Sequence, residues 1–132
     1  MTLGEKQELF SDLYSKWVRW CIDVKGWKIR PGESRILQVG PDGKGRRAQV
    51  IAKGKAGAIV RVRDLVHDAD SLHYKGLAAD PQLFVHGEWI DNTDSPYWQE
   101  AGQKWESMHD ECRWGGRWGD GNHLSIEHEG KK

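Results

Sequence analysis

Apolar residues near the start of the chain recur every three or four positions. They are Leu9, Phe10, Leu13, Tyr14, Trp17, Val18 and Cys21. This spacing predicts an amphipathic helix. Thr2, followed three residues later by Glu5, is typical of a helix start, and Gly26 predicts that the helix ends near Lys25.

The middle of the chain has the pattern of strands and turns. Pro31-Gly32 predicts a turn, followed by a strand over 34–39 and a glycine-rich turn over 41–46. Two β-prone runs, 48–52 and 58–62, flank a Lys- and Gly-rich segment and predict a hairpin or flap. The segment 64–70 is polar.

Apolar residues over 77–85 predict a buried strand, with His86-Gly87 turning the chain into a further short run at 88–90. Ser95-Pro96 predicts the start of a second helix. The buried face of this helix would hold Tyr97, Trp98, Ala101, Trp105 and Met108. A loop over 114–122 and an alternating strand over 123–127 complete the chain.

Two helices with several short strands predict a compact α+β fold. We expect a single domain over residues 1–132, built as a small antiparallel sheet flanked by helices. The chain has eight tryptophans, and core packing is the first expectation for each of them.

Composition narrows the range of partners. Twenty Lys and Arg residues balance twenty Asp and Glu residues, so no net charge favours nucleic acid. No apolar run approaches the roughly 18 residues of a membrane span, so we expect no stable membrane insertion. Cys21 and Cys112 lie far apart, resemble no disulfide framework and are interpreted as small apolar residues. We expect a monomer.

The candidate chemistry lies in two short segments. His73 precedes Asp80 by seven residues, and Asp120 precedes His123 by three. Catalytic zinc takes three protein ligands from His, Asp and Glu and leaves a fourth position for water. His73, Asp80 and His123 would form such a set, with Asp120 as a base. Spacing alone also allows ordinary surface or structural histidines.

The flanking residues add a resemblance. Ser71 to Asp80 is similar to the SxHxxGxAxD signature of the M15 family of zinc D-Ala-D-Ala carboxypeptidases and L-alanyl-D-glutamate endopeptidases. The run from Arg113 to His123 resembles the RWGGRxxDxxH ending of its phage endolysin branch. The resemblance covers residues 64–128 closely and 2–39 weakly.

The resemblance implies a hedgehog/D,D-peptidase-like fold and a Zn²⁺ site formed by His73, Asp80 and His123. It implies Asp120 as the catalytic carboxylate, and Arg35 and Ser71 as substrate-binding residues, although each of these two also reads as a plain strand or loop residue. His67, His86, His109 and His128 match no motif and are expected on the surface or in loops.

The implied activity is hydrolysis of the L-alanyl-D-glutamate bond in the stem peptides of bacterial peptidoglycan. A D-Ala-D-Ala carboxypeptidase and a non-catalytic, zinc-containing wall-binding module are the alternatives. The chain starts without a secretory signal pattern. We therefore expect a phage endolysin made in the host cytoplasm that reaches the wall after release. The segment 40–63 departs from the family pattern and leaves specificity open.

Overall fold

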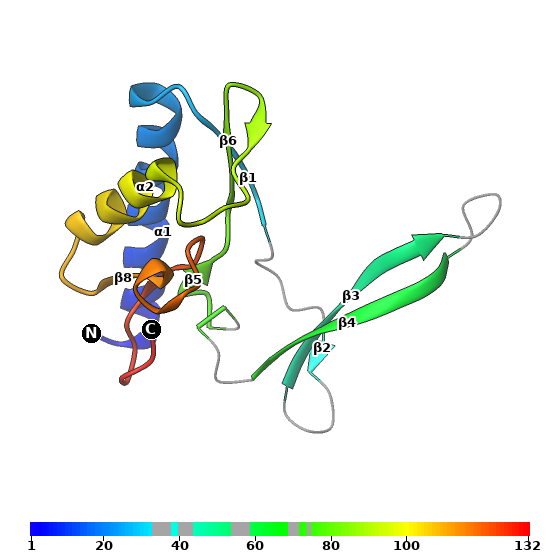
Figure 1. Ribbon diagram of the computed structural model, residues 1–132. Helices are drawn as coiled ribbons and strands as arrows, with labels where there is room; N and C mark the ends of the chain where they lie inside the picture. Colours follow the sequence, from blue (N-terminus) through cyan, green and yellow to red (C-terminus); the bar gives the residue numbers. More distant parts are fainter. Residues whose placement is uncertain (33–37, 40–43, 54–58, 69–71, 74) are drawn as a thin grey trace.

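Short antiparallel strands and two α-helices make up the described part of the chain in this computed structural model (Figure 1). The residues described are 1–32, 38–39, 44–53, 59–68, 72–73 and 75–132. The predicted α+β class is confirmed. The strands form three sheets of three strands each, where the sequence predicted one small sheet.

Helix α1 (Leu3–Arg19) begins as the sequence predicts. The hydroxyl oxygen of Thr2 accepts a hydrogen bond from the backbone N–H of Glu5 at 3.1 Å. The helix continues as one π-helical turn (Trp20–Val24) and ends at Gly26, whose φ of 70° suits glycine. Its predicted apolar stripe is confirmed, with Phe10 and Trp17 buried.

Helix α2 (Pro96–Ser107) begins at the predicted Ser95-Pro96 pair. The Ser95 side chain accepts the N–H of Trp98 at 3.3 Å, and proline occupies the first helical position, where an N–H is not needed. Trp98, Ala101 and Trp105 are buried, as predicted. Tyr97 departs from the prediction, since 39% of it is exposed and it packs edge-on against Trp27.

The first sheet has the order β1-β6-β7 and consists of β1 (Lys28–Arg30), β6 (Gln82–Val85) and β7 (Glu88–Trp89). The predicted turn at His86-Gly87 joins β6 to β7, and both residues have positive φ (52° and 79°). This backbone suits a tight hairpin. Strand β1 was not predicted, because three residues between a tryptophan and a proline are too few to show a period.

The second sheet has the order β5-β9-β8 and consists of β5 (Ala78–Ala79), β9 (Leu124–Ile126) and β8 (Cys112–Trp114). The prediction of one strand over 77–85 was wrong. The chain leaves one sheet after Ala79 and enters another at Gln82. Pro81 stands at the break, because proline has no N–H to donate to a ladder.

The last strand differs from its prediction in a similar way. Alternating burial was expected over 123–127, but Leu124, Ser125 and Ile126 are all buried. Strand β9 is the middle strand of its sheet, and the core covers it. The predicted 114–122 loop contains a short 3-10 turn (Gly115–Trp118), and strand β8 ahead of it was not predicted.

The third sheet consists of β2 (Gln38–Val39), β3 (Lys44–Lys53) and β4 (Ile59–Asp68), paired antiparallel in that order. The predicted hairpin between the two β-prone runs is confirmed, but its strands are longer than expected. Residues 44–46 are strand, where a turn was predicted, and 64–68 continue β4. Most of the predicted 34–39 strand lies outside the described residues.

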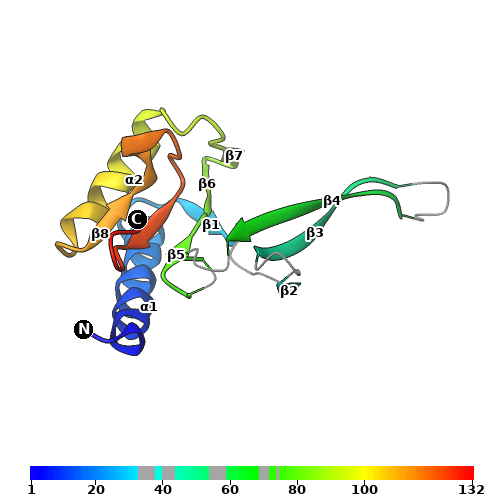
Figure 2. The ribbon, with the colours of Figure 1, turned by 90° about the horizontal axis from the view of Figure 1, so that it is seen from below.

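Buried indoles join the helices to the second sheet. Trp17 of α1 donates its Nε1–H to the carbonyl of Ala101 in α2 at 2.9 Å. Trp105 donates to the carbonyls of Arg113 and Ser125, both at 3.1 Å, and so reaches β8 and β9. Figure 2, from below, shows α1 and α2 beside these strands. Each buried indole therefore contributes both apolar burial and a satisfied hydrogen bond.

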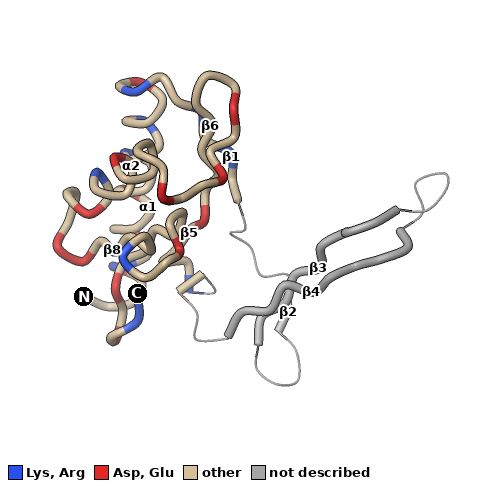
Figure 3. Tube along the Cα trace, viewed as in Figure 1, with Lys and Arg blue, Asp and Glu red and all other residues tan. Residues whose placement is uncertain are grey.

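Charged residues of both signs are interspersed over the two helices and the first two sheets (Figure 3). None of the helices in that part has the length and apolar character needed to cross a membrane. Cys21 and Cys112 are both buried and unbridged, as expected for small apolar side chains. Lys6 of α1 donates its Nζ–H to the carbonyl of Glu127 at 2.8 Å, which ties the two ends of the chain together.

Candidate metal centre

Three side chains from separate segments converge at the edge of the second sheet. His73 precedes β5, Asp80 follows it, and His123 directly precedes β9. One nitrogen or oxygen atom from each lies within 4.8 Å of the others. The grouping predicted for these residues is confirmed, and among the described residues it is the one cluster of this kind.

Strand register explains how Asp80 and His123 meet. Strands β5 and β9 are antiparallel, with Ala79 opposite Leu124. One further step along each strand places Asp80 opposite His123. The break at Pro81 ends the strand there, so the carboxylate stands at the sheet's edge.

His73 is placed by a tight turn ahead of β5. The N–H of Leu77 donates to the carbonyl of Leu72 at 2.7 Å, and the N–H of Gly76 donates to the carbonyl of His73 at 3.2 Å. Gly76 has a φ of 72°, which glycine adopts at little cost. Leu72 is 3% exposed, so the residue before the histidine is anchored in the core.

A closed loop carries Asp120 and His123. The N–H of Gly115 donates to the carbonyl of His123 at 2.8 Å, and the N–H of Asp120 donates to the carbonyl of Gly115 at 2.8 Å. A Cβ on Gly115 would lie 2.1 Å from the Asp120 oxygen and 2.7 Å from the His123 Cβ. Glycine is therefore required where the two arms of the loop touch.

A second glycine, Gly32, packs against the backbone of Asp80. A Cβ on Gly32, just past β1, would lie 1.7 Å from the backbone oxygen of Asp80. The chain after β1 thus packs directly on the backbone that carries the carboxylate. In the sequence, Pro31-Gly32 predicts only a turn, and no local pattern distinguishes a glycine of this kind.

Asp80 lies between the two imidazoles. Its Oδ2 is 3.2 Å from Nε2 of His73, and its Oδ1 is 3.3 Å from Nδ1 of His123. Burial raises the pKa of the carboxyl, but hydrogen bonding and charge from both histidines outweigh burial and lower the pKa to about 2. Asp80 is thus an anion at neutral pH.

These groups fit a bound zinc ion. Oδ1 of Asp80 is buried, and its near neighbour is Nδ1 of His123 at 3.3 Å. One ligand atom from each of the three residues lies within 4.8 Å of the others. Ligand atoms at about 2.0–2.2 Å from a tetrahedral ion stand roughly 3.3–3.5 Å apart, so a small adjustment of the side chains would place all three around one ion. Two imidazoles and one carboxylate form a donor set that suits zinc and leaves a position open.

Asp120 lies beside the cluster and outside it. Its Oδ2 is 3.9 Å from Nδ1 of His123, and its side chain is 51% exposed. Partial burial and the nearby Asp80 charge raise the pKa of Asp120, while His123 and His73 act in the opposite direction. The carboxylate is therefore open to solvent and more basic than an isolated aspartate.

Two aromatic residues near the cluster were not singled out in the sequence. The Trp118 ring lies 5.7 Å from the His123 ring, centroid to centroid, and is 42% exposed. Tyr14 of α1 has its pKa raised to about 12 by burial first, then by Cys21 and Asp80, so it is a neutral phenol near the carboxylate. Its helical spacing indicated only core packing.

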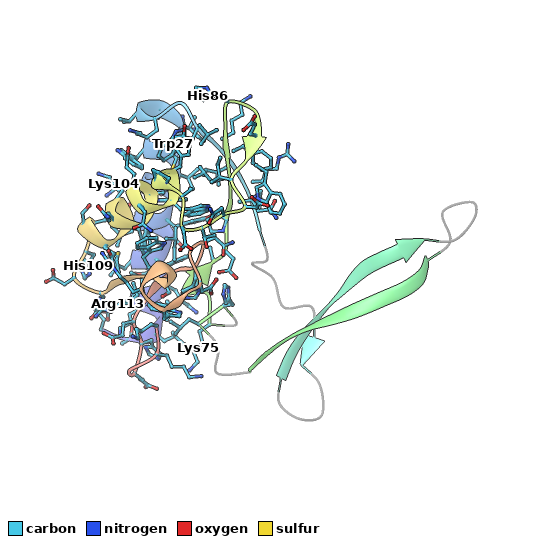
Figure 4. The ribbon with its side chains drawn as sticks, viewed as in Figure 1. Trp27, Lys75, His86, Lys104, His109 and Arg113 are labelled. Atoms are coloured by element: carbon cyan, nitrogen blue, oxygen red, sulfur yellow. The ribbon has the colours of Figure 1, made fainter. Side chains whose placement is uncertain are left out.

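The remaining candidates either lie outside the described residues or have other local partners. Arg35, Ser71 and the side chain of His67 lie outside the described residues. Figure 4 shows His86 at the β6–β7 turn and His109 beyond the end of α2. Nδ1 of His109 accepts the N–H of Glu111, and His128 lies 3.9 Å from Glu129, so both have local partners.

Comparisons with protein-family models, with curated proteins and with solved structures gave no match for this chain. The family resemblance therefore rests on the two motifs around the cluster.

Proposed function

We propose that this chain is a zinc-dependent peptidase that cleaves stem peptides of bacterial peptidoglycan. The observation that carries the proposal is the convergence of His73, Asp80 and His123, with the half-exposed carboxylate of Asp120 at 3.9 Å from Nδ1 of His123. A structural zinc site is closed by a fourth protein ligand. Among the described residues, the further carboxylate beside the cluster is the half-exposed Asp120.

His73, Asp80 and His123 would hold the ion. When bound, zinc would act as a Lewis acid that polarises the scissile carbonyl and lowers the pKa of the attacking water. Asp120 takes a proton from the attacking water and returns it to the leaving amine, a role suited to its raised pKa. Asp80 contributes a negative charge, which a third histidine in its place would lack.

The substrate follows from the resemblance to the endolysin branch of the M15 family. Its RWGGRxxDxxH ending, matched here from Arg113 to His123, favours cleavage between L-alanine and D-glutamate. Arg35 and Ser71 are proposed to bind the substrate. The biological setting proposed is a monomeric phage endolysin that acts on the wall after release from the host cytoplasm.

Two alternative functions would use the same three zinc ligands. A D-Ala-D-Ala carboxypeptidase would release free D-alanine, and a non-catalytic wall-binding module would release nothing. The position of Asp120 favours an enzyme over a binding module, because a metal held only for structure needs no exposed carboxylate beside it.

Digestion of purified peptidoglycan followed by mass spectrometry tests the proposal. The wild type should generate new N-terminal D-glutamate, and Asp120→Ala should lower the rate about 10²- to 10⁴-fold. Asp12→Ala is the matched control, since it removes only an exposed ion pair with Lys16. Free D-alanine would select the carboxypeptidase, and full activity of Asp120→Ala would contradict the mechanism.

A further inference from the structure

A hollow of about 140 Å³ is lined by two residues that directly adjoin candidate metal ligands along the chain. Pro81, which follows Asp80, and Asn122, which precedes His123, both line it. The Asn122 side chain donates to the carbonyl of Pro81 at 3.3 Å and joins the two segments. A molecule in the hollow would therefore contact the same two segments that carry Asp80 and His123.

The hollow is held in shape by buried neighbours. Trp98 lines it, is 1% exposed, and donates its Nε1–H to the carbonyl of Ile90 at 3.1 Å. Thr93 also lines it and packs so tightly on Gly121 that a Cβ there would lie 2.1 Å from the Thr93 Cβ. The loop over 91–95 is thus fixed against the segment that carries His123.

One large aromatic side chain in the lining is open to solvent. Trp89 of β7 is 55% exposed, the most exposed tryptophan among the described large apolar residues. It stands opposite Phe84 on the same face of the first sheet. The Phe84 ring is already in contact with the Arg30 guanidinium at 4.1 Å, whereas Trp89 reaches the hollow.

The chemistry of the lining selects a ligand class. An exposed indole beside Gln82, Asp91 and Asn122 offers a flat apolar face together with donors and acceptors. No Lys or Arg is among the described lining residues, which disfavours a phosphate or a carboxylate. A ring with one apolar face and several hydroxyl or amide groups, that is, a sugar, fits this combination.

We propose that the hollow beside Trp89 binds the amino sugar to which the stem peptide is attached. The inference rests on the proposed function, since it assigns a second part of the same substrate. In peptidoglycan a lactyl group and L-alanine separate this sugar from the L-alanyl-D-glutamate bond. Two chain units of about 3.5 Å place the sugar roughly 7 Å from that bond.

This separation also bears on which bond is cut. A sugar site next to the metal centre suits cleavage after the first amino acid of the stem. Cleavage of a terminal D-alanine would leave the sugar four residues away and outside the hollow. The site therefore favours the endopeptidase over the carboxypeptidase.

Two synthetic substrates test the site. One is an N-acetylmuramyl stem peptide, and the other is the same peptide with an N-terminal acetyl group instead of the sugar. The wild type should show about tenfold higher kcat/KM on the muramyl peptide. Trp89→Ala should lose this preference through a higher KM and keep its rate on the acetyl peptide, and Trp89→Phe should retain part of the preference.

Tyr97→Ala is the matched control, because Tyr97 is an exposed aromatic residue that packs on Trp27 and does not line the hollow. It should keep the preference for the muramyl peptide. Equal rates of the wild type on both peptides, or equal losses on both in Trp89→Ala, would overturn the sugar site and leave the peptidase standing.

A binding measurement separates the two proposals. The indole N–H resonance of Trp89, assigned by its loss in Trp89→Phe, should shift when the methylamide of N-acetylmuramic acid, which has an amide in place of the free carboxylate as in the stem peptide, is added to the zinc-loaded protein. A shift without hydrolysis of either peptide would support the sugar site and contradict the peptidase. Absence of any shift would count against the sugar site, whatever the activity.

Discussion

At the scale of single residues, the candidate centre depends on Asp80. Its carboxylate contacts both imidazoles, and its backbone packs against Gly32. Burial by itself would favour the neutral acid, and the histidines reverse this preference. The same carboxylate is therefore already ionised, as a metal ligand must be.

Substitutions should distinguish the proposed metal ligand, Asp80, from the proposed base, Asp120. We expect Asp80→Asn to lose bound zinc, because an amide oxygen carries no charge to offset the cation. Asp120→Asn should keep about one zinc per chain and lose activity. Zinc content by atomic emission and hydrolysis rates on the same samples provide the check, and loss of zinc in Asp120→Asn would place Asp120 among the ligands.

The two cysteines give a prediction at the same scale. Burial, the largest cause in each case, raises the pKa of both thiols to about 12. At pH 8 the folded protein should react with a thiol reagent far more slowly than the unfolded chain, which should titrate two thiols.

Alkaline stability follows from the same pKa values. Above about pH 9 the unfolded chain loses thiol protons that the folded protein keeps, so stability should fall as pH rises towards 12. Each thiol contributes up to roughly 1.4 kcal/mol per pH unit. Urea titrations at pH 8 and pH 10 measure the effect. Cys21→Ala combined with Cys112→Ala should reduce the slope, and an unchanged slope would contradict this assignment.

At the scale of elements, loops closed by glycine connect the sheets to the site. The pairing of β9 with β5 places His123 opposite Asp80. The 115–123 loop then brings Asp120 beside His123. Trp114 fixes this loop by donating its Nε1–H to the carbonyl of Gly121 at 2.7 Å. The site is therefore sensitive to backbone spacing at residues that touch no metal.

Gly115→Ala tests this dependence. The new Cβ would overlap the Asp120 oxygen and crowd the His123 Cβ, so the loop must open. We expect zinc affinity to fall by at least about tenfold, with a loss of roughly 1–3 kcal/mol of stability. Isothermal titration with zinc and urea unfolding measure the two effects.

Gly4→Ala is the control for that substitution. Gly4 lies in the first turn of α1, and the nearest atom to a Cβ there is the Thr2 Oγ1 at 3.9 Å. Alanine favours a helix, so this variant should be as stable as the wild type or slightly more stable, with unchanged zinc affinity. Equal zinc affinity in the Gly115 and Gly4 variants would refute the role given to loop closure.

At the scale of the whole molecule, the candidate centre joins parts of the chain that are distant in sequence. His73 and His123 are fifty residues apart, and Asp80 connects the first sheet to the second. A ligand that binds all three side chains stabilises only the folded state, because the unfolded chain does not hold these side chains together.

Thermal unfolding should show this linkage. Zinc at a thousand times its Kd adds about 4 kcal/mol of stability, which corresponds to a rise in Tm of roughly 10 °C or more for a chain of this size. A chelator should remove the increase. His123→Ala should show a low Tm that zinc does not raise, and an equal zinc response in that variant would argue against this site.

The sequence by itself determined both helices, their caps and the three residues that the structure groups in the candidate metal centre. Helical spacing and the Thr2 and Ser95 caps are local signals, and so are the motifs around His73 and His123. Such features depend on neighbours within a few positions, which a single sequence displays.

Only the tertiary structure decided how the strands divide among sheets. The run from Leu77 to Val85 is mostly apolar and reads as one strand, so it does not reveal that its two halves, on either side of Pro81, pair in different sheets. Burial of Ser125 depends on its strand lying between two others. The close approaches at Gly32 and Gly115, and the hollow beside Trp89, arise from segments far apart in sequence, and no local pattern records such contacts.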